Sequence, residues 1–497
     1  MNLIQNFPFF SIIMCLASGV LSSVLSGKNA KRWCIALVTT IGVMNCFVLG
    51  YVLSTGESYT YMMGHFPGPW GNELQVGVLE SLMAVFFCCI MLLSLIGGMK
   101  FVFVDIEDSK VNLYFVMICL MMSSLLALIY TNDLFNAYVF VEINTIAACA
   151  LIMIRNNGHT LVAAAKYMIM SLLGSGLVLI GISMIYDLTG HLSMPFIREA
   201  IAKITVNGEY AVPMTVVIGL ICVGLAIKSA LFPFHSWLPD AYSYSSASSS
   251  AILSSLVSKS YIFLLIKIFY RLIGMDVMVE HKITNILFVF AIIGMLMGSI
   301  SAMKSHDIRR LIAFSSVAQI GYIYMGIGLG TRAGMNAAIF HIMSHAASKA
   351  MLFIAARGLS EVSGNSKDFT DLKGSGLRNK IAGVGFTVGA LSMVGIPLFA
   401  GFTSKVYFAE AALMASQKKM AIAMVVLAIS TILNAVYFIR AVISIYTPRN
   451  EHFIVPGYKV AATMRVSLIL FILLNFFLGI FSNPIAKAIE TGLRIFA

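Results

Sequence analysis

The chain has 497 residues, of which 59% are hydrophobic and only 11% are charged, with a formal net charge of +12. A soluble domain carries about 25% charged residues, so this composition excludes an ordinary water-soluble fold. The basic residues lie in short loops between apolar segments, which is typical of membrane topology control rather than nucleic-acid binding. No nucleic-acid partner is therefore expected.

Apolar segments long enough to cross a bilayer follow one another along almost the whole chain. A spanning helix needs about 20 mostly apolar residues. We predict fourteen spans, near residues 3–26, 33–54, 79–103, 112–130, 133–154, 160–187, 213–233, 244–271, 283–303, 308–329, 333–356, 379–402, 417–446 and 461–482. No soluble domain fits between them, so we expect a single all-α polytopic membrane domain, 1–497.

Lysine and arginine are distributed unequally between the two sets of alternate loops. One set holds most of them: Lys28, Lys31, Arg32, Lys100, Lys110, Arg155, Lys304, Arg309, Arg310, Arg357, Lys367, Lys373, Arg378, Lys380, Arg449 and Lys459. By the positive-inside rule this set is cytoplasmic. We therefore expect a multi-pass protein of the cell (cytoplasmic or inner) membrane with both termini outside.

Three ionisable residues lie inside predicted spans, Glu142, Lys228 and Lys259, and Lys405 lies just beyond the predicted span at 379–402. A charge at the bilayer centre costs about 2.5–3.5 kcal/mol, so such residues are usually functional or paired. The alternatives are a structural ion pair for Glu142 and extension of a lysine to the interface. We expect the Lys267 side chain to extend to the interface. For Lys166, a functional role and extension to the interface are equally open.

A further group of titratable residues recurs every four positions. His341, His345 and Lys349 therefore share one face of a predicted helix. Each histidine alone is as consistent with packing as with a relay. The eight cysteines show no metal-ligand spacing and are interpreted as small buried hydrophobic residues. No metal and no cofactor are predicted.

Prolines and glycines interrupt the spans beside two of the charges. Pro233 follows Lys228, and Pro397 and Gly401 precede Lys405. Broken helices at corresponding places are the sequence sign of a transporter built from repeats. The interval of 177 residues between the two lysines would suit two five-helix repeats.

Three long motifs carry a family resemblance. They are residues 228–241 (KSALFPFHSWLPDA), 309–322 (RRLIAFSSVAQIGY) and 341–353 (HIMSHAASKAMLF). Together they resemble the antiporter-like subunits of respiratory complex I, the Mrp cation/proton antiporters and the membrane subunits of membrane-bound hydrogenases. The resemblance implies about fourteen helices with two inverted five-helix repeats, at about 112–271 and 283–446, flanked by helices in 1–111 and 447–497. It also implies a polar axis through Glu142, Lys228, Lys259 and Lys405.

Within this superfamily, several features resemble the D-type subunits of the Mrp antiporters. The loop 64–71 (GHFPGPWG) is similar to the corresponding D-type loop, and Lys405 rather than glutamate ends the axis. Residues 242–250 depart from the family, because serines replace a proline-containing stretch. We expect this serine-rich segment to be a less rigid loop.

The resulting hypothesis is a proton-translocating or sodium/proton antiporting subunit of a multisubunit complex. Protons would move along Glu142, Lys228, Lys259 and Lys405, with His235, His341, His345 and Lys349 as further relay groups. Expected partners are related antiporter-like membrane subunits, and an iron–sulfur or hydrogenase module if the complex is ferredoxin- or hydrogenase-linked. An independent transporter of organic solutes and a non-conducting scaffold are the alternatives.

Overall fold

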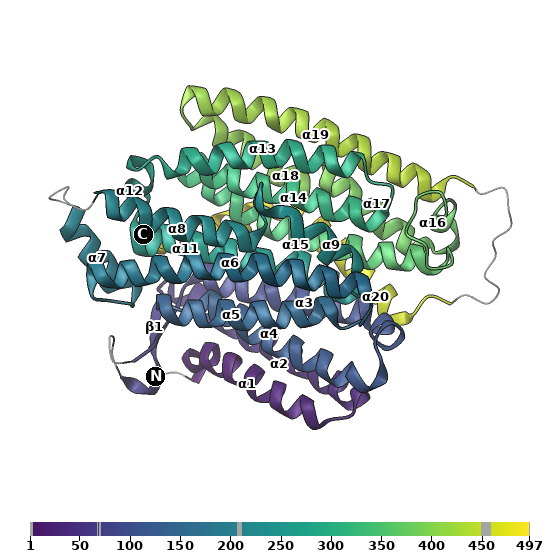
Figure 1. The fold of residues 1–497 in the computed structure, drawn as a ribbon, viewed down its shortest axis with the longest axis horizontal. Helices are drawn as coiled ribbons and strands as arrows, with labels where there is room; N and C mark the ends of the chain where they lie inside the picture. Colours follow the sequence, from purple (N-terminus) through teal and green to yellow (C-terminus); the bar gives the residue numbers. More distant parts are fainter. Residues whose placement is uncertain (1–2, 67, 69–70, 206–210, 449–458, 497) are drawn as a thin grey trace.

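The computed structural model describes residues 3–66, 68, 71–205, 211–448 and 459–496. In this part of the chain, thirteen helices are long and apolar enough to cross a membrane, which confirms an all-α polytopic membrane protein. They lie side by side with their axes roughly along the horizontal of Figure 1. Helices are the expected solution in lipid, because each satisfies its backbone hydrogen bonds internally.

The first half of the chain supplies seven long helices, which alternate in direction across the bundle. They are α1 (Phe7–Val24), α2 (Gly27–Thr55), α3 (Val78–Asp105), α4 (Val111–Tyr130), α5 (Leu134–Met153), α6 (Gly158–Thr189) and α8 (Ala211–Ser229). Local signals fix the ends of α6: Asn157 and Thr160 form a reciprocal capping box, and Gly190 ends the helix in the left-handed conformation.

The second half supplies the centre of the bundle and its other side. One crossing is made of α10 (Ala247–Ile252), η5 (Leu253–Val257), α11 (Ser258–Ile268) and η6 (Phe269–Ile273), in which η5 and η6 are π-helical. The others are α13 (Ile283–Met303), α14 (Ile308–Gly328), α15 (Arg332–Glu361), α17 (Lys380–Val394), α18 (Ala400–Leu413), α19 (Gln417–Tyr446) and α20 (Ala462–Ile480). The apolar windows of Ala247–Ile273 and α15 are wholly buried, so these two crossings form the core.

Short elements cover the two ends of the bundle. They are η1 (Leu3–Asn6), β1 (Tyr59–Met62), η2 (Met63–His65), β2 (Glu73–Val76), η3 (Asp108–Lys110), α7 (Met194–Thr205), η4 (Phe234–Trp237), α9 (Leu238–Tyr244), α12 (Met275–Glu280), α16 (Ser375–Arg378) and α21 (Ser482–Phe496). β1 and β2 pair antiparallel, with Tyr59 opposite Val76. The sequence reasoning did not predict this ribbon or the surface helices α7 and α21.

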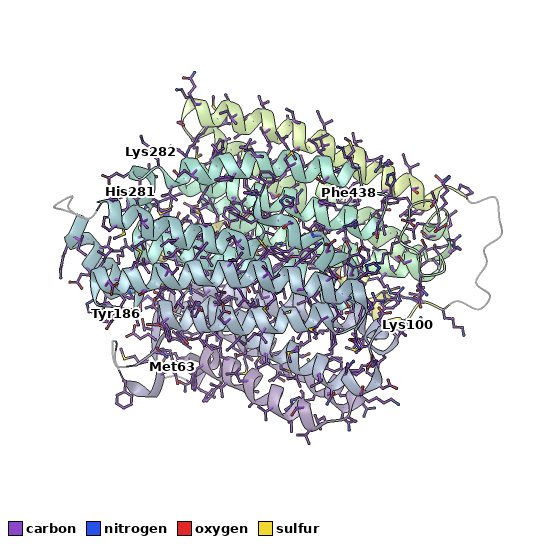
Figure 2. All side chains as sticks on the ribbon, in the orientation of Figure 1. Met63, Lys100, Tyr186, His281, Lys282 and Phe438 are labelled. Atoms are coloured by element: carbon purple, nitrogen blue, oxygen red, sulfur yellow. The ribbon has the colours of Figure 1, made fainter. Side chains whose placement is uncertain are left out.

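We call the two ends the terminal face and the basic face. The terminal face carries both chain ends, β1, α7 and α12, on the left of Figure 1, and the basic face carries α9 and α16 on the right. Figure 2 places Tyr186 and His281 at the terminal face and Lys100 at the basic face.

The predicted helix breaks are present. After α8 the backbone turns at Ala230, which has a φ of +62°, and continues through η4 into α9. Between α17 and α18 it turns at Gly395 (φ +90°) and Leu398 (φ +77°). The predicted span at 379–402 is thus divided, and Lys405 lies inside α18 rather than beyond the end of a helix.

The serine-rich segment 242–250 is not the loose loop that was expected. It forms the end of α9 and most of α10, and its serines are buried. The Arg309 guanidinium donates hydrogen bonds to the carbonyls of Tyr242 (3.1 Å) and Ser245 (2.7 Å) and to the Ser250 hydroxyl (2.5 Å). The buried Arg309 guanidinium therefore holds the segment in place by hydrogen bonds, at positions where prolines were expected. In the loop 64–71, residues 67, 69 and 70 lie outside the described residues.

Candidate functional site

The first part of the candidate site is a buried lysine beside a carboxylate. The Lys228 ammonium, in the last turn of α8, lies 3.5 Å from a carboxylate oxygen of Glu142 on α5 and donates to the Thr145 hydroxyl at 2.8 Å. The Lys228 side chain is wholly buried, whereas the Glu142 side chain is 25% exposed. Ser175 on α6 donates a hydrogen bond to the same Glu142 oxygen. The lysine thus has one ionic and one neutral partner.

Close packing of α6 and α8 brings these groups together. A Cβ atom on Gly174 would lie 2.8 Å from the Gly224 carbonyl, and one on Gly224 would lie 2.6 Å from the Gly174 carbonyl. Only glycine permits this approach of the two backbones. Ser175 follows Gly174, and Lys228 lies one helical turn after Gly224. The close approach of α6 and α8 therefore places both side chains against the face of α5 that carries Glu142.

Lys259 occupies the centre of the core crossing. It follows the π-helical turn η5, its side chain is fully buried, and its ammonium donates to the Ser254 carbonyl at 2.6 Å. Single π-helical turns expose backbone groups and are frequent at functional sites. Here the turn supplies an acceptor for a cation that has no carboxylate within ion-pair distance among the described residues.

The predicted helix face of His341, His345 and Lys349 is present and points into the core, and we call it the α15 face. The rings of His341 and His345 have centroids 6.1 Å apart, and both side chains are buried. Lys349 donates to the Ile312 carbonyl at 3.0 Å and to the Ser315 hydroxyl. α15 packs against η5 and α11, the elements that carry Ser254 and Lys259. The histidine face therefore lies between lysines of different helices.

Lys405 forms the far end of the arrangement. Its ammonium donates to the Val394 carbonyl at 2.7 Å and to the Thr431 hydroxyl at 3.1 Å, and it lies 5.7 Å from the centre of the Tyr322 ring. Tyr322 stacks on His341, whose Nδ1 is 2.9 Å from the hydroxyl of Ser404, the neighbour of Lys405. The break between α17 and α18 provides the carbonyl that binds the lysine.

The predicted residues thus form three groups rather than one continuous hydrogen-bonded chain. Glu142 and Lys228 make one group, and Lys259 with the α15 face makes the second. Lys405 makes the third, which contacts the second through Ser404 and Tyr322. Several buried polar atoms between them have no hydrogen-bond partner in the described part of the chain: both nitrogens of His345, Nε2 of His341, both amide atoms of Gln319 and the Ser344 hydroxyl. Such atoms in proteins are usually satisfied by water.

His235 is not joined to these groups by any described contact. It lies after the break that follows α8, where its ring stacks on Phe232 with centroids 5.3 Å apart. Lys166 pairs with Asp240 at 2.5 Å, and half of its side chain is exposed. The predicted interfacial position of Lys267 is wrong, because its side chain is completely buried.

The sequence reasoning missed the uncharged partners of the axis. Thr145, Ser175, Tyr322 and Thr431 all contact a predicted charged residue or its histidine neighbour. Thr145 could have been found, because it lies three residues after Glu142 and so on the same helix face. The others come from helices remote in sequence. The described residues contain no cluster of three or more His, Cys, Asp or Glu side chains that could hold a metal ion.

Comparison with known proteins places this arrangement in a family. Residues 131–432 match the family model described as NADH:quinone oxidoreductase/Mrp antiporter, transmembrane. The chain belongs to this family. The matched region contains Glu142, Lys228, Lys259, the α15 face and Lys405.

The relatives cover nearly the whole chain. The N subunit of the NADH-quinone oxidoreductase of Desulforudis audaxviator is 30% identical over 473 residues, which is 93% of this chain and 92% of the relative. The D subunit of the Na⁺/H⁺ antiporter of Bacillus subtilis is 24% identical over 488 residues, 98% and 96% of the two chains. The predicted relationship to the D-type Mrp subunits and the complex I superfamily is confirmed.

Solved structures show the same fold. A chain of the membrane-bound sulfane sulfur reductase, an archaeal respiratory membrane complex, superposes with a TM-score of 0.88 at 24% identity, covering 100% of this chain and 98% of that one. A chain of the Mrp complex from Dietzia superposes with a TM-score of 0.85 at 23% identity, covering 99% and 97%.

Proposed function

We propose that this chain is an ion-translocating membrane subunit of a multisubunit complex, and that it moves protons through Glu142, Lys228, Lys259, the α15 face and Lys405. The observation that carries the proposal is the Glu142–Lys228 pair, at 3.5 Å, inside an apolar bundle. A buried charge pair is costly to maintain, and intramembrane ionisable residues are functional by default. The family assignment and the subunit relatives support the same role.

The first group can work as a switch. A neighbouring carboxylate favours the protonated ammonium, whereas burial favours the neutral amine. If Glu142 moves away from Lys228, the buried ammonium releases its proton more readily. If Glu142 returns, Lys228 takes up a proton again. The Ser175 hydrogen bond to Glu142 and the Thr145 hydroxyl next to Lys228 hold the two groups in position.

The second and third groups can carry the proton onward. Lys259, His345, His341 and Lys405 are proton carriers that lie along the core, and Ser404 bridges toward Lys405. The unpartnered nitrogens of His345 and the Gln319 amide support a path that is completed by water. Because these groups interact, they would titrate as a set rather than one by one.

The exposed quarter of Glu142 supports coverage by a neighbouring subunit. Phe135, Val139 and Ile146 are exposed on the same helix, so this surface of α5 is apolar around the carboxylate. A carboxylate facing lipid is expensive. An adjoining membrane subunit would remove it from lipid and could move it relative to Lys228. The two relatives, an oxidoreductase N subunit and an antiporter D subunit, are named as subunits of larger assemblies.

The repeat organisation and the orientation are part of the proposal. The segments 112–271 and 283–446 begin with α4 and α13, which run in opposite directions across the bundle (Figure 1), as an inverted repeat requires. The positive-inside rule would place the basic face in the cytoplasm and the terminal face outside. Moving one charge against 100 mV requires about 2.3 kcal/mol, which an ion gradient or a partner's redox chemistry would supply.

The test is driven ion movement by the whole complex in vesicles. Lys228→Ala should abolish driven proton or sodium movement in complexes that assemble with all their subunits. Lys110→Ala, at an exposed ion pair with Glu107, is the matched control and should leave transport unchanged. Normal transport by assembled Lys228→Ala complexes would instead identify the chain as a non-conducting scaffold.

A second measurement identifies the complex to which this chain belongs. Purification in mild detergent, followed by identification of every co-purifying chain, separates the alternatives. Iron–sulfur or nickel subunits would exclude a pure antiporter assembly, and small membrane partners alone would exclude a ferredoxin- or hydrogenase-linked one.

A further inference from the structure

A second buried charged cluster lies outside the proposed path, near the terminal face. Lys267 near the end of α11, Arg271 in η6 and Glu80 at the start of α3 are all buried. An Arg271 guanidinium nitrogen lies 2.5 Å from a Glu80 carboxylate oxygen. When all three side chains are ionised, this cluster carries a net charge of +1.

The environment of Lys267 fits a charged ammonium. It donates to the carbonyls of Leu128 (3.4 Å), Ile129 and Thr131 (3.0 Å), at the end of α4. A lysine ammonium has three donors, and these three acceptors use all of them. The carbonyl end of a helix also favours a cation. The positive charge is therefore held in place by the backbone of α4.

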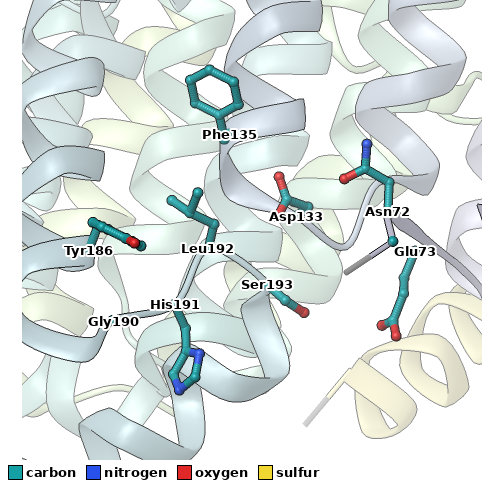
Figure 3. A pocket seen from close by; sticks show the side chains of 10 residues that line it. Asn72, Glu73, Asp133, Phe135, Tyr186, Gly190, His191, Leu192 and Ser193 are labelled. Carbon is teal, nitrogen blue, oxygen red and sulfur yellow. The ribbon is translucent and has the colours of Figure 1, made fainter. Parts of the chain in front are cut away.

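A pocket with acidic side chains lies on the other side of the same turn. Its volume is about 460 Å³, and its lining includes Glu73, Asp133 and Ser193. Figure 3 shows Asp133 and Ser193 on adjoining segments at this pocket. The Thr131 hydroxyl donates to the Asp133 carbonyl at 3.1 Å, while the Thr131 carbonyl accepts from Lys267. One turn thus separates the pocket from the buried ammonium.

The cluster also lies in line with the proton path. Lys259, Phe263 and Lys267 recur every four residues and share one face of α11. The Lys267 ammonium lies 5.9 Å from the centre of the Phe263 ring. A cation that entered from the pocket and moved toward Lys259 would therefore meet an aromatic ring and a fixed positive charge.

We propose that Lys267 is a cationic barrier that prevents metal cations in the acid-lined pocket from reaching Lys259. Carboxylates at the pocket attract cations from the terminal face, and the fixed charge behind them repels those cations. Arg271 and Glu80 anchor η6 against α3 and keep this end of the crossing closed. The inference rests on the proposed ion-conducting function and adds a selectivity to it.

The test is passive sodium leakage from vesicles that contain the whole complex, with no driving substrate. Lys267→Gln removes the charge but retains an amide with two N–H donors for the α4 carbonyls. The barrier predicts at least about tenfold faster sodium efflux in this variant, equivalent to about 1.4 kcal/mol of lost barrier. Lys267→Arg keeps the charge, so its sodium efflux should stay as slow as that of the unchanged complex. The surface control Lys110→Gln should also show unchanged sodium efflux.

A second variant separates charge from packing. Glu80→Gln breaks the Arg271 ion pair but makes the cluster more positive, so it should not leak sodium. Leakage by both Glu80→Gln and Lys267→Gln would overturn the barrier in favour of simple loosening. Unchanged sodium efflux from Lys267→Gln vesicles would also overturn the barrier. So would failure of the Lys267→Gln complex to assemble while the Lys267→Arg complex assembles. Driven transport is measured in the same Lys267→Gln vesicles. If driven transport persists, the proposed function stands whatever the sodium efflux shows about the barrier.

Discussion

Lys228 and Lys405 both lie at helix breaks, but their surroundings differ. Lys228 has a carboxylate 3.5 Å away and a threonine hydroxyl at 2.8 Å. Lys405 has a backbone carbonyl at 2.7 Å and a threonine hydroxyl at 3.1 Å. A carboxylate can change the proton affinity of a lysine when it moves, whereas a backbone carbonyl is fixed. From this difference we infer that Lys228 controls the proposed path and that Lys405 serves as its terminal carrier.

Among changes to the partners of the two lysines, the largest expected effect comes from removing the charge of Glu142. Glu142→Gln keeps the shape of the side chain but leaves Lys228 without its carboxylate. An opposite charge changes a proton equilibrium by about ten- to a thousandfold, so driven transport should fall by a factor in this range. The measurement is the initial rate of driven proton movement in vesicles. An unchanged rate would show that Lys228 does not depend on Glu142.

The two threonines offer a matched and smaller test. Thr431→Val removes one of the two hydrogen-bond acceptors of Lys405, whereas Thr145→Val leaves Lys228 with Glu142. A hydrogen bond to a charged group is worth about 1.5–3 kcal/mol, so Thr431→Val should slow transport by roughly tenfold or more. Thr145→Val should have a clearly smaller effect under the same conditions. The reverse order would contradict the proposed difference between the two lysines.

The smallest expected effect lies at the basic face, where the two proposed repeats meet. Lys367 donates to the Ser243 carbonyl at 3.0 Å. Burial, followed by the nearby Arg309 charge, lowers the pKa of Lys367 to about 8. The unfolded chain therefore binds more protons between about pH 8 and pH 10.5, and stability should rise with pH in this window.

Lys367→Gln should flatten that rise. The expected observation is a smaller increase in the midpoint of thermal unfolding between pH 7.5 and pH 9.5 than in the unchanged complex. Other groups near Lys367 that act on it are Asp307, Arg155 and Arg357, and they remain in the variant. An equally steep rise in Lys367→Gln would assign the pH dependence to groups other than Lys367.

The sequence was sufficient for the membrane fold and for the charged residues of the site. Apolar length identifies spans, and a charge inside such a span is conspicuous, as Glu142 and Lys259 show. Prolines and glycines also identified the two breaks. The resemblance carried by the three motifs then predicted an order of these charges along an axis, which composition alone could not, and that order stays a prediction.

The partners of these charges could not be predicted in the same way. Thr431 and Ser175 are ordinary polar residues of apolar helices, and only tertiary packing makes them neighbours of Lys405 and Glu142. Lys267 was mispredicted because distance from a helix end says nothing about depth in the bundle. Its ammonium is bound by carbonyls of α4, a helix more than a hundred residues earlier. The serine-rich segment was mispredicted because its brace, Arg309, comes from α14.

Replacement of Lys228 by arginine tests the central claim most directly. Arginine keeps the positive charge and can still pair with Glu142, but its guanidinium does not release a proton in proteins. The measurement is driven proton movement by complete Lys228→Arg complexes in vesicles. Our account predicts assembled complexes with no driven proton movement. Transport at the original rate would contradict it, because the charge of residue 228 would then matter and its proton would not.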